Sequence, residues 1–477
     1  MPDILWTSKD IEVATGGLAS APFACSGLSI DTRSLKPGDL FVALEDIRDG
    51  HDFVAAGFER GSTGALVSRD LDGRGPFLKV GNVLQALEAL AVAARARSEA
   101  TRTAVTGSVG KTSVKEMLAQ IFSAVGPAHW PEKSFNNHWG VPLTLARMPE
   151  ATSRAVFEIG MSTPGEIAPR SKLVRPHHAL ITKIAPAHLE GLGSIEAVAE
   201  EKSNIFAGLE AGGTVIVPED DAFRDYLADR GRSYCPTSTV ESFGTADGAT
   251  ARLVDAKTDG STSRFEIEIA GRRASVMLNA VGNHWGVNAA AALLLATLTG
   301  ISINDAADAL SGFGPPPGRG TLETLRLPGG GTFTLVDDAY NANPESMRAA
   351  LAALVSRPAT QKFIALGEML EIGEGSELAH SELARPVLAT GAERIFLAGT
   401  AMGALESALS GKIETESESR ALDLLEKVKN ALTDGCVLLI KGSNASGMFR
   451  LADALREWGA VESANVMGAQ AESDGRV

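Results

Sequence analysis

The residues with the clearest chemistry lie in the run Thr106-Gly107-Ser108-Val109-Gly110-Lys111-Thr112. Residues 103–105 before it predict a short buried strand, and residues 113–122 after it carry apolar side chains at helical spacing. A strand, a glycine-rich turn and a helix in this order are typical of a phosphate-binding loop, whose backbone amides face an anion. In such a loop Lys111 reaches the terminal phosphates and the Thr112 hydroxyl binds Mg²⁺. The run therefore predicts a site for a nucleoside triphosphate.

The spacing of this loop departs from the common pattern G-x-x-x-x-G-K-[ST], because Val105 stands where the first glycine is expected. The loop is thus a shorter variant, G-x-x-G-K-T. The alternative is a glycine-rich turn that carries Lys-Thr by chance. The predicted strand and helix on either side favour the phosphate loop over that alternative.

Three further polar clusters follow predicted strands in the middle of the chain. They are Glu158–Met161, Pro186–Gly191 and Glu200–Phe206. Open α/β sheets bind their ligands at the carboxyl ends of strands, so these clusters are candidate site segments. Taken alone, Glu158 is better explained as a surface carboxylate, and His188 as a structural histidine; the phosphate loop upstream of them reverses that preference. Lys202 alone predicts a surface lysine that pairs with neighbouring glutamates.

The alternation of strands and helices predicts an α/β protein, and 477 residues suggest about three domains. We expect a small α/β domain over 1–98 and a central domain over 99–314, similar to a phosphate-loop ATPase with a mainly parallel sheet. The run Pro315-Pro316-Pro317-Gly318 reads as a stiff linker. A Rossmann-like, doubly wound domain is expected over 315–462, and a disordered polar tail over 463–477.

The strands and helices expected to position the clusters follow the same alternation. In the central domain the expected strands are 102–105, 155–159, 179–184 and 214–217, with a hairpin over 265–278 and a helix from Asn283 to Leu298. In the third domain the expected strands are 333–336, 363–366, 395–397 and 436–440, with helices from Glu345, near Glu377, over 420–432 and from Met448.

Composition excludes several classes of function. A net charge of −15 without a long basic run argues against nucleic acid as a partner. The three cysteines lie far apart, so no metal, redox or disulfide spacing is present. The first ten residues lack an apolar signal core, and the most apolar run, 286–298, is too short to span a membrane. We therefore expect a cytoplasmic protein, and a monomer, because no long heptad predicts an interface.

Several runs together resemble the Mur ligases, the ATP-dependent amide-forming enzymes of peptidoglycan precursor synthesis. Besides the loop at 106–112, the runs are Ser134–Asn137, Gly140–Thr144, Phe157–Met161, Pro186–Glu190, Asp337–Pro344, Leu366–Met369 and Lys441–Ser443. They follow the family's order along nearly the whole chain. The sequence is most similar to the branch that adds D-alanyl-D-alanine to UDP-N-acetylmuramoyl-tripeptide, and it has no Asp-Asn-Pro-Arg run, the signature of the branch that adds diaminopimelate. Two small departures are Ala339, in place of a serine, and Trp139.

The resemblance implies a reaction with two substrates, UDP-N-acetylmuramoyl-tripeptide and D-alanyl-D-alanine. ATP phosphorylates the terminal carboxylate of the tripeptide, the amine of the dipeptide attacks the acyl phosphate, and phosphate leaves. Such phosphoryl transfer depends on positioning and on charge neutralisation, so ATP, two Mg²⁺ ions and protein cations are expected. The third residue of the tripeptide stays open between diaminopimelate and lysine.

The resemblance also implies roles for individual residues. The catalytic set is Lys111, Glu158, His188, Lys202 and Arg319, and the metal set is Thr112, Glu158, His188 and Lys202. The nucleotide set is Thr106, Gly107, Ser108, Val109, Gly110, Lys111, Thr112, Asn283, His284, Arg319, Asp337 and Asp338. The substrate set is Asp31, Thr32, Arg33, Asn136, Asn137, Asn341, Asn343 and Lys441. The first domain is implied to bind the UDP moiety, and Lys202 is implied to be carbamylated.

Plainer interpretations exist for some of these residues. Asp31 and Arg33 also suit a solvated turn pair, Asn283 a helix N-cap, and 315–320 a passive linker.

Three other functions compete with this ligase. One is another Mur-type ligase, and a second is an enzyme like folylpolyglutamate synthase, which has a similar phosphate loop. The first hundred residues and the run Asn341-Ala342-Asn343-Pro344 argue against the synthase. A third is a nucleotide-dependent regulatory protein that has lost catalysis. Loss of catalysis is disfavoured, because the chain keeps all four candidate catalytic residues, Lys111, Glu158, His188 and Lys202.

Overall fold

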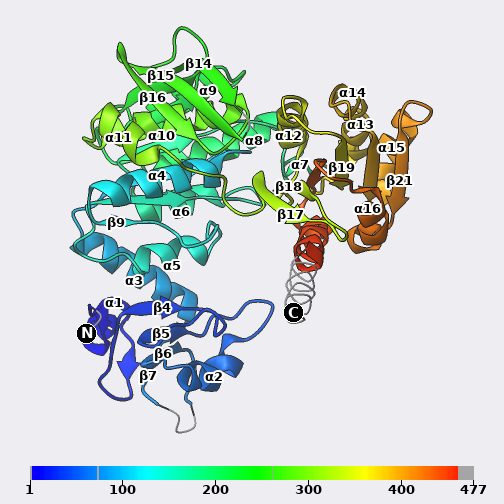
Figure 1. Cartoon of the computed structure of the whole chain (residues 1–477). Coiled ribbons are helices and arrows are strands. Elements are labelled where there is room, and N and C mark those ends of the chain that lie inside the picture. The colour runs from blue at the N-terminus through cyan, green and yellow to red at the C-terminus, as the bar shows by residue number, and fades with distance from the viewer. Residues whose placement is uncertain (1–2, 72–74, 260, 460–477) are drawn as a thin grey trace, which may run out of the picture.

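The computed structural model describes residues 3–71, 75–259 and 261–459, in which three sheets of five or more strands follow one another along the chain (Figure 1). The tail expected to be disordered, 463–477, lies outside these residues. Within the described ranges, no helix is both long and apolar enough to cross a membrane.

The N-terminal sheet is small and mainly parallel. In spatial order its strands are β2 (Leu18–Ala19), β7 (Phe77–Lys79), β6 (Gly64–Val67), β5 (Asp39–Val42) and β4 (Gly27–Ser29), with β1 (Trp6–Thr7) and β3 (Ala24–Cys25) as a separate pair. The helices are α1 (Ser8–Thr15), α2 (Val54–Glu59) and α3 (Val83–Arg97). Asn82 caps α3 because its side chain accepts a hydrogen bond from the Gln85 amide.

The N-terminal part shares one hydrophobic core with the central part. Leu87 and Leu90 of α3 and Leu143 and Leu145 of α5 (Gly140–Ala146) are fully buried in the same cluster. Nε1 of Trp6 also donates a hydrogen bond to the Ala146 carbonyl at 2.9 Å. A continuous core of this kind fixes the two parts relative to one another.

The central sheet has nine strands, and the seven from β9 to β14 run parallel. In spatial order they are β16 (Arg272–Leu278), β15 (Thr262–Ile269), β14 (Ala251–Asp259), β13 (Thr239–Gly244), β12 (Thr214–Pro218), β11 (His178–Ile181), β8 (Thr101–Thr106), β10 (Arg154–Glu158) and β9 (Ala128–His129). The antiparallel pair β15–β16 is the expected hairpin, and it turns at Gly271 with a φ of 76°. The mainly parallel sheet expected from the sequence is thus confirmed.

Helices cover the central sheet and hold the polar clusters at its carboxyl edge. They are α4 (Lys111–Val125), α5, α6 (Ile167–Val174), α7 (Leu189–Leu192), α8 (Ile195–Ser203), α9 (Arg224–Tyr234), α10 (Asn283–Leu298) and α11 (Ile303–Leu310). The alanine- and leucine-rich α10 is buried along most of its length, in one core cluster with α4.

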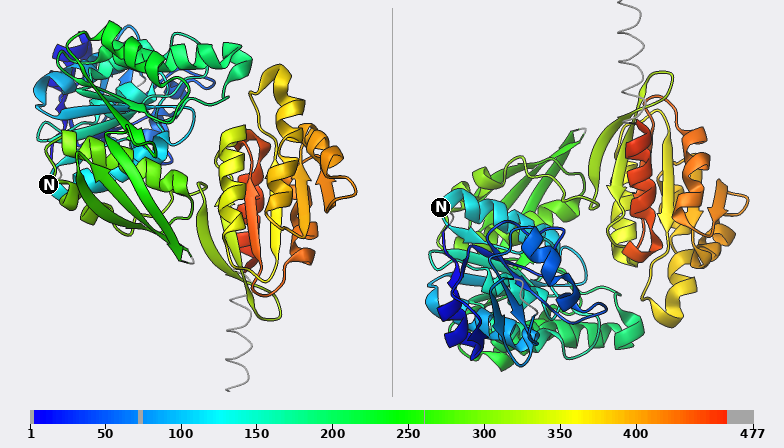
Figure 2. Two further views of the ribbon diagram at one scale, coloured as in Figure 1. Left: turned by 90° about the horizontal axis from the view of Figure 1, so that it is seen from above. Right: turned by 90° about the horizontal axis from the view of Figure 1, so that it is seen from below.

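The C-terminal sheet is doubly wound, as expected. In spatial order its strands are β17 (Thr321–Arg326), β18 (Thr332–Asp338), β22 (Val437–Lys441), β19 (Lys362–Gly367), β20 (Arg394–Ala398) and β21 (Glu414–Glu418), all parallel except β17. Helices on its two faces include α12 (Pro344–Val355), α13 (Ser376–Ser381), α14 (Ala384–Ala389), α15 (Gly403–Leu409), α16 (Leu425–Ala431) and a helical segment over 448–459. Neighbouring residues of β19 enter two different core clusters, which lie on opposite faces of the sheet. Figure 2 shows this part as a body beside the central one.

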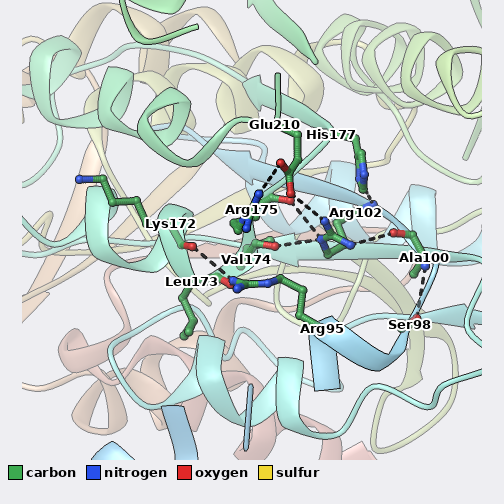
Figure 3. A network of polar contacts seen from close by, with 10 residues as sticks. All are labelled: Arg95, Ser98, Ala100, Arg102, Lys172, Leu173, Val174, Arg175, His177 and Glu210. Atoms are coloured by element: carbon green, nitrogen blue, oxygen red, sulfur yellow. Dashed lines mark hydrogen bonds and ion pairs between the residues drawn. The ribbon is translucent and has the colours of Figure 1, made fainter. Parts of the chain in front are cut away.

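A network of arginines fastens α3 to the central part at the end of β8 that is remote from the phosphate loop (Figure 3). Arg95 of α3 donates to the Leu173 carbonyl, and Arg102 donates from Nε to the carbonyls of Val174 and Arg175 at 3.0 Å. These carbonyls end α6, where positive charge is stabilising. Glu210 balances the charge by accepting from Arg102 at 3.2 Å, so this network has a structural role.

The structure corrects details of the expected elements. The strand expected over 179–184 ends at Ile181, because Thr182 and Lys183 turn to bond the phosphate loop. The helix expected over 420–432 begins as a 3₁₀ turn (Ala421–Leu424). In the N-terminal part a 3₁₀ turn (Gly50–Phe53), capped by the Asp49 side chain, precedes α2.

Candidate active site

The carboxyl edge of the central sheet and the C-terminal part enclose a cleft of about 500 Å³. Of the residues expected at the site, those that line it are Ser108, Val109, Gly110, Lys111, Thr112, Asn136, Glu158, His188, Lys202, His284, Arg319, Asp338, Asn341, Asn343 and Lys441. They come from both parts of the chain, so the cleft forms only when the two parts lie together.

The phosphate loop has the backbone that its glycines predict. Gly107 and Gly110 have φ angles of 149° and 84°, which other residues rarely adopt. A Cβ atom at Gly107 would lie 1.9 Å from Oγ1 of Thr182, so only glycine fits there. The Thr182 hydroxyl donates to the Val109 carbonyl at 2.5 Å, and the Ser108 hydroxyl donates to the Ala185 carbonyl at 2.8 Å. These two hydrogen bonds hold the loop against the segment that follows β11, the strand beside β8 in the sheet.

Lys111, at the first position of α4, bends back over the loop. Its Nζ donates to the Gly107 carbonyl at 2.6 Å. Burial and the nearby Arg319 lower the pKa of the Lys111 ammonium, and the Glu158 carboxylate opposes that shift. A cation held inside the curve of a phosphate loop is arranged to contact a terminal phosphate.

Glu158, at the end of β10, is a buried carboxylate with neutral partners. It is 1% exposed, and its two oxygens accept from the Thr112 hydroxyl at 2.9 Å and from Nδ2 of Asn136 at 2.8 Å. Gly160 allows this approach, because a Cβ atom there would lie 2.7 Å from Cγ of Asn136. No cation bonds this carboxylate in the part of the chain that the structure describes. A buried carboxylate beside a hydroxyl is a donor set that suits a hard divalent cation.

Lys202, in the last turn of α8, is buried in the same cleft. It is 1% exposed, and within the described ranges its Nζ has no hydrogen-bond or ion-pair partner. Glu201 is engaged elsewhere, because its carboxylate accepts from the amides of Gly165 and Ile167. Burial and the neighbouring Lys111 hold the pKa of the Lys202 amine well below its ordinary value. The interpretation of Lys202 as a surface lysine paired with glutamate is therefore wrong.

His188 reaches the cleft from the loop before α7, and it has a left-handed backbone with a φ of 57°. Its Nδ1 lies 2.5 Å from Oε2 of Glu371, a residue of the C-terminal part. Sequence reasoning missed Glu371, because nothing in its local pattern links it to a segment 183 residues away.

The C-terminal part contributes cations and amides to the cleft. Arg319 lies over the ring of Tyr340, 4.1 Å from its centre, and Nζ of Lys441 lies 2.8 Å from Oδ2 of Asp338. The Lys441 ammonium also donates to the Asn341 carbonyl at 3.0 Å, whereas the Asn343 side chain caps α12.

Asp337 and Asp338 point to opposite faces of β18, because they are consecutive in a strand. Asp338 lines the cleft, whereas Asp337 is 4% exposed and pairs with Arg456 at 2.5 Å. Asp337, which was expected at the nucleotide, thus lies away from this cleft.

Other expected site residues also lie outside the lining of the cleft. The Thr106 carbonyl accepts from the Thr182 amide, and the Gly107 carbonyl accepts from Nζ of Lys111. Oδ1 of Asn137 accepts from the Gly140 amide at the start of α5. Asn283 is the first residue of α10, and Gly282 holds the N-cap position that Asn283 was considered for. Asn288, one turn further along α10, does line the cleft, and Gly110 lies against its side chain. The sequence feature that could have identified Asn288 as a site residue is its place as a polar residue inside an alanine-rich helix.

The turn over 31–33 lies in the N-terminal part, after β4. Arg33 donates to the Asp31 carboxylate at 2.7 Å, and its side chain is 87% exposed. This geometry matches the solvated turn pair, and it leaves both side chains accessible to a ligand.

Comparisons with known proteins agree with this arrangement. A family model for the Mur ligase middle domain matches residues 105–296, and one for the Mur ligase glutamate ligase domain matches 322–472. The UDP-N-acetylmuramoyl-tripeptide–D-alanyl-D-alanine ligase of Escherichia coli is 34% identical over 95% of this chain and 98% of its own. The enzyme of the same name from Bacillus subtilis is 33% identical over 94% and 98%. The crystal structure of MurF from Acinetobacter baumannii superposes with a TM-score of 0.82 at 28% identity, over 96% of this chain and all of that one.

Proposed function

The chain belongs to the Mur ligase family, and on this premise we propose that it joins D-alanyl-D-alanine to UDP-N-acetylmuramoyl-tripeptide with cleavage of ATP to ADP and phosphate. The observation that carries the proposal is the cleft itself, in which a phosphate loop, a buried carboxylate and a buried lysine from one part face an arginine and a lysine from the other. Relatives that carry this name match along almost their full length.

The reaction begins with transfer of the γ-phosphoryl group of ATP to the terminal carboxylate of the tripeptide. Two anions must meet in this step, so positive charge at the transferred group lowers the barrier. Lys111 from α4 and Arg319 from the other wall are the cations that we assign to this role. The stacking of Arg319 on Tyr340 limits the orientations of its guanidinium.

Magnesium would be held by the hydroxyl of Thr112, the carboxylate of Glu158 and the imidazole of His188. When bound, Mg²⁺ supplies charge neutralisation between the phosphates and the substrate carboxylate. Asn136 orients the Glu158 carboxylate through its hydrogen bond.

Lys202 would join this set as a carbamate. Addition of CO₂ needs the neutral amine, and burial beside Lys111 favours that form because it lowers the pKa of Lys202. The step forms an N–C bond, opens one C=O π bond of CO₂ and releases one proton from the nitrogen, and it converts the neutral amine into an anionic oxygen ligand. The carbamate and the Glu158 carboxylate would then both be negatively charged, and together they would balance part of the charge of two Mg²⁺ ions.

In the second step the neutral amine of D-alanyl-D-alanine attacks the carbonyl carbon of the acyl phosphate. A C–N bond forms, the C–O bond to phosphate breaks with its electron pair on the phosphate, and the nitrogen releases one proton. Lys441, Asn341 and Asn343 line the wall from which we propose that the dipeptide enters. The C-terminal part has its own core clusters, so it can move as a unit and exclude water from the acyl phosphate.

We assign binding of the UDP moiety to the N-terminal domain, 1–98, through the turn Asp31-Thr32-Arg33. Arg33→Ala should weaken binding of the UDP substrate and leave the affinity for ATP unchanged in separate titrations. The reverse pattern would refute this division of roles between the domains.

Release of phosphate tests the proposed function. The enzyme should release phosphate only when UDP-N-acetylmuramoyl-tripeptide and D-alanyl-D-alanine are both present. Release with folate and glutamate would indicate the synthase instead, and release with a single amino acid as acceptor would indicate another Mur-type ligase. A protein that binds ATP but releases no phosphate with any of these substrates would fit a regulatory role.

A further inference from the structure

The face of β18 that points away from the cleft carries a cluster of charged side chains around Arg456. Arg456 lies in the helical segment over 448–459. Its Nε donates to the Glu323 carboxylate at 2.8 Å, and its Nη2 donates to Oδ2 of Asp337 at 2.5 Å. Its Nη1 donates to the Asp453 carboxylate at 2.7 Å. Because Glu323 belongs to β17 and Asp337 to β18, the guanidinium bridges two antiparallel strands.

Arg456 has no contact with the cleft. Within the described ranges, the lining of the cleft includes neither Arg456 nor Asp337. Arg456 instead lines a second cavity of about 580 Å³, and Gly318 and Tyr340 line both cavities. An effect of Arg456 on a reaction in the cleft must therefore pass through residues that lie between the two cavities.

Asp337 depends on Arg456 for its charge balance. Its carboxylate is buried, and Oδ1 accepts from the Ala339 amide at 3.1 Å while Oδ2 faces the guanidinium. Hydrogen bonds, mainly to Glu323 and then to Asp337, raise the pKa of the Arg456 guanidinium above its ordinary value, so it stays charged. Removal of the cation from a buried ion pair leaves an uncompensated charge, and the end of β18 would have to rearrange.

The end of β18 in turn holds Arg319 in place. The Asp337 carbonyl accepts from the Gly320 amide at 2.8 Å, and the Gly318 carbonyl accepts from the Tyr340 amide at 2.9 Å. The backbone on both sides of Arg319 is thus bonded to β18 and to the turn that follows it. A Cβ atom at Gly318 would lie only 3.2 Å from Cβ of Tyr340, and the Arg319 guanidinium lies 4.1 Å from the centre of the Tyr340 ring.

We propose that Arg456 is a positioning residue for ligation, which acts from the back of β18 through Asp337 and Tyr340 on Arg319. This inference rests on the proposed function for the role of Arg319 at the transferred phosphoryl group. Arg456 fixes Asp337, Asp337 fixes the end of the strand, and that end fixes the backbone and the ring that orient Arg319. A small displacement of a group that stabilises a transition state lowers the rate, even when the substituted residue is remote from the chemistry.

A double-mutant cycle between Arg456 and Arg319 tests this series of contacts in the full-length protein. Arg456→Met removes the cation, and Arg319→Met removes the residue to be positioned. Arg450→Met is the matched control, because Arg450 is an exposed arginine of the same helical segment. The single-turnover rate of phosphoryl transfer should fall by up to about 100-fold in Arg456→Met and should match the wild type in Arg450→Met.

The effect of Arg456→Met should disappear when Arg319 is already replaced, so the double variant should be as slow as Arg319→Met alone. Arg456→Lys should regain part of the rate, because a lysine keeps the charge but cannot bridge both carboxylates with a planar fork.

Binding of ATP and of ADP gives a second readout that does not require ligation. Arg319→Met and Arg456→Met should shift the ratio of the two dissociation constants in the same direction, because both disturb a contact with the terminal phosphate. If the wild type binds ATP but forms no amide, the proposed function is refuted, and the ratios still decide whether Arg456 positions Arg319.

Equal factors of loss from Arg456→Met in the wild type and in Arg319→Met would overturn the proposal, because Arg456 would then act independently of Arg319. An unchanged rate in Arg456→Met, with or without a lower melting temperature, would assign it a purely structural role. An unchanged ratio of ATP to ADP affinity in Arg456→Met would also contradict the positioning of Arg319. If thermal melts show that Arg456→Met does not fold, the same cycle with Arg456→Lys decides by the same criteria.

Discussion

His188 and Glu371, which belong to different parts of the chain, share a hydrogen bond of 2.5 Å between Nδ1 and Oε2. Both residues have a left-handed backbone, with φ angles of 57° and 62°. The Glu190 amide donates to the Glu371 carbonyl at 3.3 Å, and a Cβ atom at Gly373 would lie 3.4 Å from Cα of Glu190. The two loops are therefore docked through backbone as well as side chains, and non-glycine residues in this conformation are often found at functional sites.

Glu371 fixes which nitrogen of His188 carries the proton. The carboxylate, whose pKa is lowered mainly by this hydrogen bond, accepts from Nδ1–H, so Nε2 keeps its lone pair for a metal. We predict that Glu371→Ala raises the Mg²⁺ concentration for half-maximal rate by about 10- to 100-fold. Direct titration with Mn²⁺ should show the same loss. Glu374→Gln, in the adjacent exposed turn, is the control, and equal Mg²⁺ dependence in both variants would contradict the positioning role.

Lys111→Ala should abolish ligation and leave the fold intact. Loss of one positioned charge at a transferring phosphoryl group raises the barrier by about 3–4 kcal/mol, a fall in kcat of about 100- to 1000-fold. Steady-state kinetics together with a thermal melt measure both effects. Near-normal turnover would remove the phosphate-loop role from Lys111.

Gly107→Ala should prevent nucleotide binding for a steric reason, because the new Cβ would overlap Oγ1 of Thr182. Gly391→Ala is the matched control, since its φ is also positive, 67°, but no atom lies within 4 Å of the added Cβ. The control should lose only about 1 kcal/mol of stability from backbone strain and should keep its ATP affinity. Equal ATP affinities in the two variants would show that the close packing at Gly107 is not required.

Lys202→Ala should be nearly inactive and should regain part of its rate with a short-chain carboxylic acid, which restores an anionic oxygen. Lys202→Arg should be inactive, because it keeps the charge but cannot form a carbamate. Bicarbonate depletion should lower the rate of the wild type only. Full activity of Lys202→Arg would show that positive charge or packing is sufficient at this position.

The sequence predicts the central features of this protein because they depend on local patterns. The phosphate loop needs glycines between a strand and a helix, and residues 106–112 show that pattern without any tertiary information. The sheet types follow from alternation, and the polar clusters at Glu158, His188 and Lys202 follow from the rule that strand ends meet at one edge.

What the sequence could not predict depends on which faces meet. Consecutive aspartates look equivalent in a sequence, and only the pleat of β18 sends Asp338 to the cleft and Asp337 to Arg456. Glu371 contacts His188 across the junction of two parts that have separate cores, so no local signal marks it.

The most direct test of the account follows the oxygen of the substrate carboxylate. UDP-N-acetylmuramoyl-tripeptide labelled with ¹⁸O in its terminal carboxylate is incubated with ATP, Mg²⁺ and D-alanyl-D-alanine, and the phosphate and the amide product are analysed by mass spectrometry. An acyl-phosphate route transfers one labelled oxygen to the released phosphate and leaves the other in the amide carbonyl. Amide formation with unlabelled phosphate, or no amide at all, would contradict the function and mechanism assigned to this cleft.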